Sequence, residues 1–487
     1  MGIAIISSYP PRRCGIAEFT YDLRHAILSS GESEVPIIAL TRDKADNYGS
    51  EVVFSVQQDR LEDYIQAAEF INRAPNIQAV SLQHEFGLFG GIFGNYIVEL
   101  LSRLRKPVYT TFHTVINDPP EALSQTAIAI GNYSRRVITL SQSGIRFLQS
   151  TYNMPESKLV HIPLGVAAAS EEQQQATVKQ KLGLANYTVA VTFGLISPNK
   201  GIETVLNSLP EVIKHSPQFM YYILGATHPE ERRHHGEDYR NQLIEIVQTH
   251  GLENNVRFIP YFLSNEELLE YIMACDIYIT PYLYKEQISS ATLTLAAHQG
   301  KALLSSPYYY AEELLSDGCG MLFPFHDVPA LTKQLNELIR NDDLRNQLGQ
   351  AVKNKTASYT WPQVGRTYYE MIINDNLHDY QALLDSLNPQ PALSSPAPPL
   401  QAARLSRRLR RRARLKRRRG WRRRKRVARD GIRVLAGKRR KAAKLAGSRR
   451  ASKLRVRPGK ISGRLRKARK ISGLRRSARA RKAGVAV

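Results

Sequence analysis

Short apolar runs alternate with amphipathic helical patterns along this chain, and the alternation occurs in two successive series. Parallel strands joined by crossover helices produce such a pattern, because helices cover both faces of the sheet. The sequence therefore predicts an α/β fold of two doubly wound, Rossmann-like domains facing a cleft, with ligands beyond the carboxyl ends of the strands. The predicted strands are residues 2–8, 35–40, 77–85, 106–114, 135–141 and 158–165 in the first series, and residues 188–194, 219–225, 255–261, 275–283, 301–307 and 320–325 in the second.

Polar and proline-rich stretches divide the chain further. Residues 170–181 are polar and predict either a link between the domains or a surface helix. Residues 386–400 contain five prolines and three serines, which is the composition of a disordered, semi-rigid linker. The predicted segments are therefore a first domain at 1–168, a second at 185–345, helices at 346–382 that pack back on the first domain, the linker and a tail at 401–487.

The tail is strongly basic. Although the whole chain has a net charge of +26, residues 401–487 hold 39 Lys and Arg residues against one acid, Asp430, so the preceding body is acidic. Low apolar content and self-repulsion predict a disordered segment. Three alternatives stay open: a solvated charge run, an end foreign to the fold, or a segment that binds nucleic acid, an anionic glycopolymer or an acidic membrane surface.

Cysteine usage and hydropathy indicate the compartment. Cys14, Cys275 and Cys319 are odd in number and lack metal-binding spacing, which suits a reducing cytosol better than a disulfide framework. No stretch approaches the roughly 18 uninterrupted apolar residues of a membrane span. The N-terminus shows no secretory signal. We expect a cytoplasmic protein without a transmembrane segment, peripheral at an anionic membrane or polymer surface if the tail binds there.

The stretch from Val189 to Glu203 has the pattern of an anion site. A predicted strand ends at Gly194, a turn follows, and Lys200 and Gly201 stand where a helix begins. Unpaired backbone N–H groups and the positive end of the helix dipole attract a phosphate, and the lysine adds a full charge. The alternative is an ordinary surface turn of an α/β unit.

Several segments, in this order, resemble the group 1 (family 4) retaining glycosyltransferases of the GT-B fold. The resemblance covers about residues 1–380 and does not extend to the tail. It implies a nucleotide-diphosphate sugar held by the second domain, an acceptor held by the first, and transfer with retention. It also implies that the helix near Trp361 crosses back onto the first domain. The segments are SSYPPRRCGIAEFTYDL, QHEFGLFGG, TTFHT, TFGLISPNKGIE and SSPYYYAEELLSDGCGMLFPF.

The resemblance places four candidate site residues in the first domain. Gly15, in the loop after the first strand, would lie beside the donor phosphates, the alternative being a simple turn glycine. His113 ends a predicted strand and would contact the transferring sugar as a catalytic residue. His84 and Glu85 end the preceding strand and would contact the acceptor or the sugar, the alternative being a buried, hydrogen-bonded pair.

Lys200 is the leading catalytic candidate in the second domain. Transfer builds negative charge on the departing nucleoside diphosphate, which a cation or a helix dipole stabilises. The chain contains no Asp-x-Asp pair, so we expect neither a metal nor any other cofactor. One departure from the family pattern is Leu195, which stands where an arginine is usual.

Residues 285–300 correspond to the family's pair of glutamates, eight positions apart. Counting back from Gly300 places these positions at Gln287 and Leu295, neither of which is a carboxylate. Glu286 would substitute for the first of them, whereas Leu295 cannot bond a ribose. We expect Glu286 and Gln287 to help hold the donor. The hydroxyl residues Ser289, Ser290 and Thr292 are predicted to bind phosphate at a helix start.

The predicted function is metal-independent retaining transfer from a nucleotide-diphosphate sugar to an unidentified sugar, lipid or polymer. Two alternatives remain at this point. Leu195, Gln287 and Leu295 are also compatible with a catalytically weakened GT-B domain that binds a sugar or nucleotide. The tail is compatible with a protein whose main role is polyanion binding. A phosphorylase is disfavoured, because no lysine motif for a pyridoxal cofactor is present.

Overall fold

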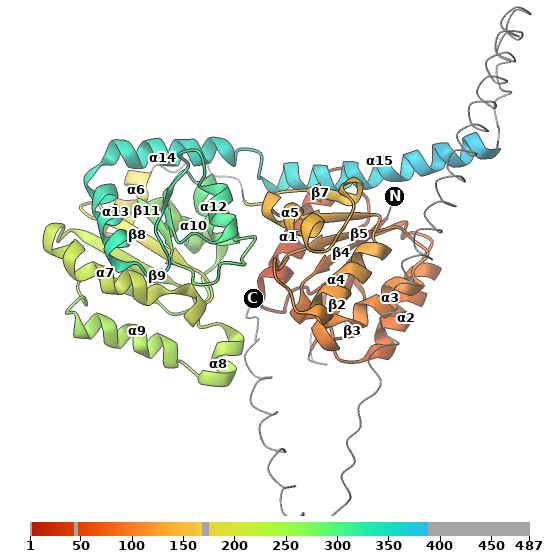
Figure 1. Ribbon diagram of the computed structural model, residues 1–487, viewed down its shortest axis with the longest axis horizontal. Helices are drawn as coiled ribbons and strands as arrows, with labels where there is room; N and C mark the ends of the chain where they lie inside the picture. Colours follow the sequence, from red (N-terminus) through yellow and green to blue (C-terminus); the bar gives the residue numbers. More distant parts are fainter. Residues whose placement is uncertain (1, 43–46, 168–174, 388–487) are drawn as a thin grey trace, which may run out of the picture. The chain divides into compact units, whose positions relative to one another are not determined.

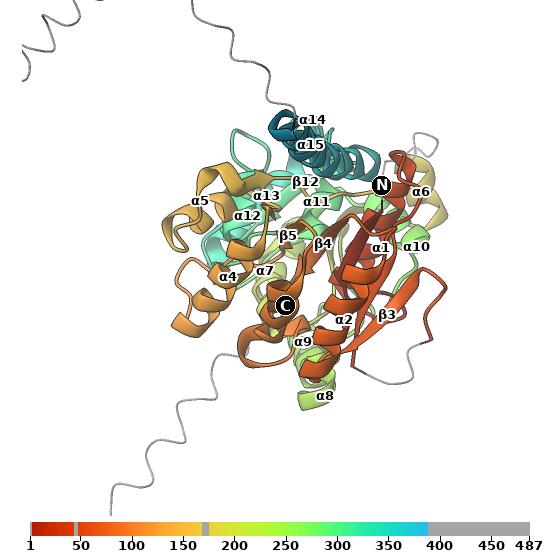
Figure 2. The same ribbon diagram turned by 90° about the vertical axis from the view of Figure 1, so that its right-hand side faces the viewer.

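The computed structural model describes the chain except residues 1, 43–46, 168–174 and 388–487. Contacts unite the residues up to Asp379 into one compact unit. This unit contains two separate parallel sheets, which are drawn in Figure 1 and, turned by 90°, in Figure 2. The predicted linker beyond Leu387 and the basic tail lie outside the described residues.

The first sheet has seven parallel strands in the order β3-β2-β1-β4-β5-β6-β7. The strands are β1 (Ile3–Ser7), β2 (Ile37–Thr41), β3 (Val52–Gln57), β4 (Ala79–His84), β5 (Val108–Phe112), β6 (Arg136–Thr139) and β7 (Leu159–His161). The helices between them are α1 (Gly15–Ser29), α2 (Leu61–Arg73), α3 (Tyr96–Arg103), α4 (Glu121–Tyr133) and α5 (Gln142–Ser150). The strand order reverses between β1 and β4, where doubly wound folds bind their ligands.

The second sheet has six parallel strands in the order β10-β9-β8-β11-β12-β13. The strands are β8 (Thr188–Phe193), β9 (Phe219–Leu224), β10 (Val256–Ile259), β11 (Ile277–Thr280), β12 (Ala302–Ser305) and β13 (Met321–Leu322). The helices are α6 (Gln175–Lys181), α7 (Ile202–His215), α8 (Pro229–His235), α9 (Asp238–Thr249), α10 (Asn265–Ala274), α11 (Ala291–His298), α12 (Tyr309–Leu314), α13 (Val328–Arg340) and α14 (Asp342–Lys355). The predicted fold of two Rossmann-like domains is confirmed.

Alternate residues of the central strands pack into different cores, which explains their uninterrupted apolar runs. In β1, Ala4 and Ile6 pack with α2 and α3 in one cluster. Ile3 and Ile5 pack on the opposite side with α1 and with the last helix, α15 (Trp361–Leu387). A strand buried on both faces has no polar alternation. The second sheet divides its core in the same way.

The C-terminal helices differ from the expectation for residues 346–382. Helix α14 packs against β12 and α11 of the second sheet, so the segment up to Lys355 belongs with the second domain. Helix α15 packs on the core of the first domain (Figure 1), where Tyr368 donates or accepts a hydrogen bond with Thr111 at 3.0 Å between their oxygens. The helix continues to Leu387, into the start of the predicted linker.

Two other expectations are refined by the structure. Strand β3 had no predicted counterpart; it lies at the edge of its sheet, and most of its residues are partly or fully exposed. Its sequence, VVFSVQ, contains an apolar run like those of the other strands, and the prediction missed it. Of the polar stretch 170–181, the described part forms α6, whose Lys179 bonds Asp276 at 2.5 Å. It is therefore a helix of the second domain.

Candidate active site

Glycines allow the chain to turn sharply after β8. Gly194 has φ of +143° and Gly201 has φ of +60°, conformations that a residue with a Cβ rarely adopts. A Cβ on Gly201 would lie 2.2 Å from the carbonyl oxygen of Pro281, so the turn after β8 packs directly on the loop after β11. The carboxyl ends of these two neighbouring strands therefore form one surface.

Lys200 lies on this surface among hydroxyl groups. Its Nζ stands 4.0 Å from the centre of the Tyr282 ring. An added Cβ at Gly194 would be 3.9 Å from this Nζ and 3.8 Å from the methyl group of Thr292. The hydroxyls of Thr292 and Tyr282 are 3.0 Å apart. Within the described ranges, no carboxylate pairs with Lys200. Its charge is held by the aromatic face and faces the space over Gly194.

The start of α7 does not match the prediction of free N–H groups facing a phosphate. The N–H of Ile202 donates to the hydroxyl of Tyr239 at 3.2 Å, and that hydroxyl donates to Glu203 at 2.5 Å. Gly201 itself is packed against Pro281. The structure therefore gives Gly201 a packing role, and the Lys200 side chain is what this turn offers to an anion.

The start of α11 lies beside Lys200. The Ser290 hydroxyl caps the helix by accepting the N–H of Leu293 at 3.3 Å. Ser290 is also 3.4 Å from the hydroxyl of Thr292. An anion held here would meet the positive end of the α11 dipole as well as the lysine. The structure thus brings together the predicted residues Gly194, Lys200, Ser290 and Thr292.

The loop before α11 reaches the first domain. Glu286 accepts the backbone N–H of Asn117 at 2.7 Å. Ser289 donates to the carbonyl oxygen of His113 at 3.3 Å. Gln287 braces the loop by donating to the Ser289 carbonyl at 2.9 Å. The donor-binding role predicted for these three side chains stays a prediction, but the loop joins the α11 start to His113.

His113 follows the end of β5 and is almost fully enclosed. Its Nε2 is 3.0 Å from Oε1 of Gln83, and its ring packs edge-on against Phe19 at 4.6 Å between centres. Burial lowers the pKa of His113 to about 3. The imidazole is therefore neutral at physiological pH, and one ring nitrogen acts as donor while the other acts as acceptor.

The structure corrects the prediction for His84. Its ring is fully buried, is stacked on Phe89 and meets Phe86 and Phe112 edge-on. Neither ring nitrogen has a hydrogen-bond partner in the described part of the chain. Burial lowers the pKa of His84 to about 3. A sugar does not reach this ring, so His84 is a residue of the core.

Glu85 is buried but hydrogen-bonded. One carboxylate oxygen accepts the hydroxyl of Thr114 at 2.6 Å, and the other accepts the N–H of Phe86 at 2.9 Å. Burial raises the pKa of Glu85 to about 7, although these two hydrogen bonds oppose the rise. Only 3% of the residue is exposed. The environment therefore matches the buried, hydrogen-bonded alternative more closely than direct contact with an acceptor.

The raised pKa of Glu85 predicts a pH-dependent stability. The folded pKa of about 7 exceeds the ordinary 4.5. The stabilisation that protonated Glu85 gives the folded state is therefore present below pH 4.5 and is lost as pH rises through 7. The loss is roughly 3 kcal/mol. We expect the free energy of unfolding of Glu85→Gln, measured in urea, to rise relative to that of the wild type between pH 5 and pH 8. Glu62→Gln, at an exposed position, is the control. A constant difference between Glu85→Gln and wild type would contradict the prediction.

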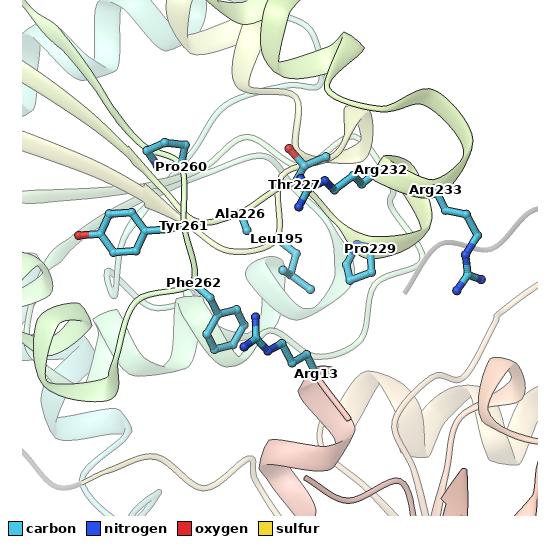
Figure 3. Close-up of a pocket in the computed structure, with 10 residues that line it drawn as sticks. All are labelled: Arg13, Leu195, Ala226, Thr227, Pro229, Arg232, Arg233, Pro260, Tyr261 and Phe262. Atoms are coloured by element: carbon cyan, nitrogen blue, oxygen red, sulfur yellow. The ribbon is translucent and has the colours of Figure 1, made fainter. Parts of the chain in front are cut away.

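A cavity of about 510 Å³ adjoins this site. Arg13, from the segment before α1, reaches it from the first domain, as Figure 3 shows. Its guanidinium carbon lies 6.0 Å from the centre of the Phe262 ring. The predicted residue Gly15, two positions on, is exposed and faces open space. The cavity is lined by Arg13, Leu195, Ala226, Thr227, Pro229, Arg232, Arg233, Pro260, Tyr261 and Phe262.

Two leucines that depart from the family pattern lie in different surroundings. Leu195 is half-buried and lines the cavity. Leu295 packs against two of the apolar cores. In the described part of the chain, no group of three or more His, Cys, Asp or Glu side chains is placed to hold a metal ion. Cys14, Cys275 and Cys319 are free thiols.

The second domain matches a known family. Residues 174–355 match the family described as "Glycosyl transferases group 1". The D-inositol 3-phosphate glycosyltransferase of Corynebacterium efficiens is 24% identical over 38% of this chain and 42% of the relative. A phosphatidyl-myo-inositol mannosyltransferase of Mycolicibacterium smegmatis is 23% identical over 53% of this chain and 62% of the relative. The chain spans about half the length of the curated relatives it matches.

Solved structures resemble both domains together. Sucrose-phosphate synthase from Thermosynechococcus elongatus aligns with a TM-score of 0.65 at 16% identity, over 77% of this chain and 99% of its own. The Anabaena protein HepE in complex with UDP and glucose aligns with a TM-score of 0.60 at 16% identity, over 76% and 99%. These similarities confirm the GT-B fold. No helix in the described ranges has the length and apolar character required to cross a membrane.

Proposed function

We propose that this chain, whose residues 174–355 match the group 1 glycosyltransferases, is a glycosyltransferase that transfers a sugar from a nucleotide-diphosphate sugar to an acceptor with retention and without a metal ion. The observation that carries the proposal is the cluster formed by Lys200, Gly194 and the start of α11. It offers an unpaired ammonium group, a glycine that leaves room for a ligand, and two hydroxyl groups at a helix N-terminus. A diphosphate matches all three features.

The proposed reaction breaks the bond between the anomeric carbon and the diphosphate oxygen. The acceptor hydroxyl oxygen then bonds the anomeric carbon, and its proton passes to an oxygen of the departing diphosphate. Negative charge grows on the departing diphosphate, so groups that are already oriented towards it lower the barrier. Lys200 and the α11 dipole supply this stabilisation in our proposal. In our proposal His113, whose neutral ring is held by Gln83, hydrogen-bonds a hydroxyl group of the sugar.

The nucleotide and the acceptor are further parts of the proposal. HepE, a protein of similar fold, was crystallised with UDP and glucose, so UDP-glucose is the first donor to test. The names of the curated relatives include an inositol phosphate and a phosphatidylinositol. Acceptors with a polyol group are therefore the first class to test. We further propose a cytoplasmic location, with the basic tail binding an anionic surface or polymer.

We expect one of UDP, GDP or ADP to raise the unfolding temperature of the protein in the presence of EDTA. A ligand at a hundredfold excess over its Kd stabilises the folded state by about 2.7 kcal/mol. Lys200→Ala should lose the shift, whereas Lys285→Ala should keep it, because Lys285 is paired with Glu312 at 3.3 Å. Differential scanning fluorimetry measures the shift.

The outcome separates the two functions that the sequence leaves open. Binding followed by transfer or donor hydrolysis supports the enzyme. Binding without turnover supports a sugar- or nucleotide-binding module, which the replacement of carboxylates by Gln287 and Leu295 would explain. The absence of a shift with all three nucleotides and their sugars would contradict the proposed donor site.

A further inference from the structure

A nucleoside diphosphate carries more negative charge than the Lys200 cluster neutralises. The terminal phosphate alone carries up to two negative charges near neutral pH, and the inner phosphate adds a third. Lys200 contributes one positive charge, and the remaining groups of its cluster are neutral hydroxyls and a helix dipole. Leu195, the residue after Gly194, turns an aliphatic side chain into the adjoining cavity. A second cation must therefore come from elsewhere along the cavity wall.

Arg13 is the cation on that wall that we consider for binding the diphosphate. Arg232 is paired with Glu237 at 3.4 Å, and Arg233 is paired with Glu230 at 3.2 Å. Arg13 has no carboxylate partner among the residues that the structure describes, and it is exposed. In the described part of the chain its guanidinium lies over the ring of Phe262.

The Phe262 contact holds the guanidinium without neutralising it. A cation over an aromatic face keeps its charge and its N–H donors, and the contact reduces the freedom that a long side chain loses on binding. Figure 3 shows the guanidinium of Arg13 near Leu195 and Phe262. Leu195 lines this cavity and directly follows Gly194, beside which the Lys200 ammonium group lies. A guanidinium also binds phosphate oxygens in a two-pronged geometry.

We propose that Arg13 binds the diphosphate of the donor from the first domain and acts as the second cation beside Lys200. Arg13 is then a specificity-determining residue that distinguishes a nucleoside diphosphate from a nucleoside monophosphate. The inference rests on the proposed function, because it assumes that a nucleoside diphosphate occupies the site. It adds a cation of the first domain to the lysine and hydroxyl groups that the second domain supplies.

The test compares diphosphates with monophosphates by isothermal titration calorimetry. UDP, GDP, ADP, UMP, GMP and AMP are titrated into the full-length wild type, Arg13→Ala and Arg13→Lys. We expect Arg13→Ala to weaken binding of the preferred diphosphate about tenfold to a hundredfold. Binding of the matching monophosphate should change much less. The affinity of Arg13→Lys for the diphosphate should lie between those of the wild type and Arg13→Ala, because lysine keeps the charge but lacks the two-pronged guanidinium.

A second substitution tests the location of the charge. In the Arg13→Ala background, Leu195→Arg places a guanidinium at another residue that lines the same cavity. We expect the double variant to regain most of the lost diphosphate affinity. Arg12→Ala is the matched control, because Arg12 belongs to the same loop but donates to Gln58 at 3.5 Å. It should bind both nucleotides as the wild type does. The unfolding temperature of the unliganded Arg13→Ala protein should equal that of wild type.

Two results would overturn this inference and leave the proposed function standing. One is an Arg13→Ala protein that binds the diphosphate as tightly as wild type does. The other is an equal loss for diphosphate and monophosphate, which would show that Arg13 does not read the second phosphate. If the wild type binds none of the three diphosphates, the proposed function and this inference are both overturned.

Discussion

Replacing Lys200 with alanine is expected to lower kcat by about two to three orders of magnitude, which is the typical effect of removing one group that stabilises developing negative charge. The Nζ of Lys200 lies 4.0 Å from the Tyr282 ring centre and faces the space over Gly194. Its interaction with the diphosphate strengthens as the sugar departs. The effect should therefore be larger on kcat than on the KM for the donor.

The matched control for this experiment is Lys285→Ala. Lys285 also lies over a tyrosine ring, 5.3 Å from the centre of Tyr309, but it is exposed and paired with Glu312. Its removal should leave kcat within about twofold of wild type. Lys200→Arg keeps the charge with a larger head group and should recover part of the rate. An equal effect of both alanine substitutions would contradict the role of Lys200.

Replacing Asp375 with alanine is expected to cost about 2 to 4 kcal/mol of unfolding free energy. Asp375, on α15, is 6% exposed and binds Arg136 through both oxygens at 2.7 and 2.8 Å. It also pairs with Arg135 at 3.3 Å. Removing the carboxylate leaves two guanidinium groups without this partner. Because both arginines are about one-third exposed, solvent relieves part of the loss.

Urea unfolding monitored by circular dichroism measures this loss. Asp342→Ala is the control, because Asp342 is exposed and pairs with Arg345 within one helix. Its effect should stay within about 0.5 kcal/mol. The ion pair with Arg136 lowers the pKa of Asp375, so its contribution is lost as pH falls through the lowered pKa. A loss equal to that of Asp342→Ala would show that the ion pair does not hold α15 on the first domain.

The two sheets could be predicted because their central strands are buried on both faces. Strands such as β8 and β11 carry continuous apolar runs, which leave a strong local pattern. Strand β3 was missed although its sequence, VVFSVQ, is also largely apolar, so the pattern did not identify every strand. The residues near Lys200 were also predictable. They follow the carboxyl ends of neighbouring parallel strands, where the topology alone brings them together.

The errors at the site came from partners distant in sequence. The N–H at the start of α7, expected to face a phosphate, belongs to Ile202 and donates to the hydroxyl of Tyr239. His84, expected to contact the acceptor, is enclosed by Phe86, Phe89 and Phe112. Arg13 was not among the predicted residues, because its position over Phe262 depends on packing between the domains. The pair of arginines in the segment PPRRCG was the signal available in the sequence. Local patterns identify which strand ends meet, but they do not show which polar groups already have a hydrogen-bond partner.

The aromatic contacts of Phe19 have a consequence for how such enzymes are recombined. The Phe19 ring lies 4.6 Å from His113 and 5.1 Å from Trp361, between ring centres. Trp361 also packs on Gly165, where a Cβ would be 2.4 Å from the indole. The first residue of α15 thus forms part of the wall that supports His113. A hybrid enzyme built by exchanging domains between relatives must therefore inherit its first domain and its final helix from the same parent.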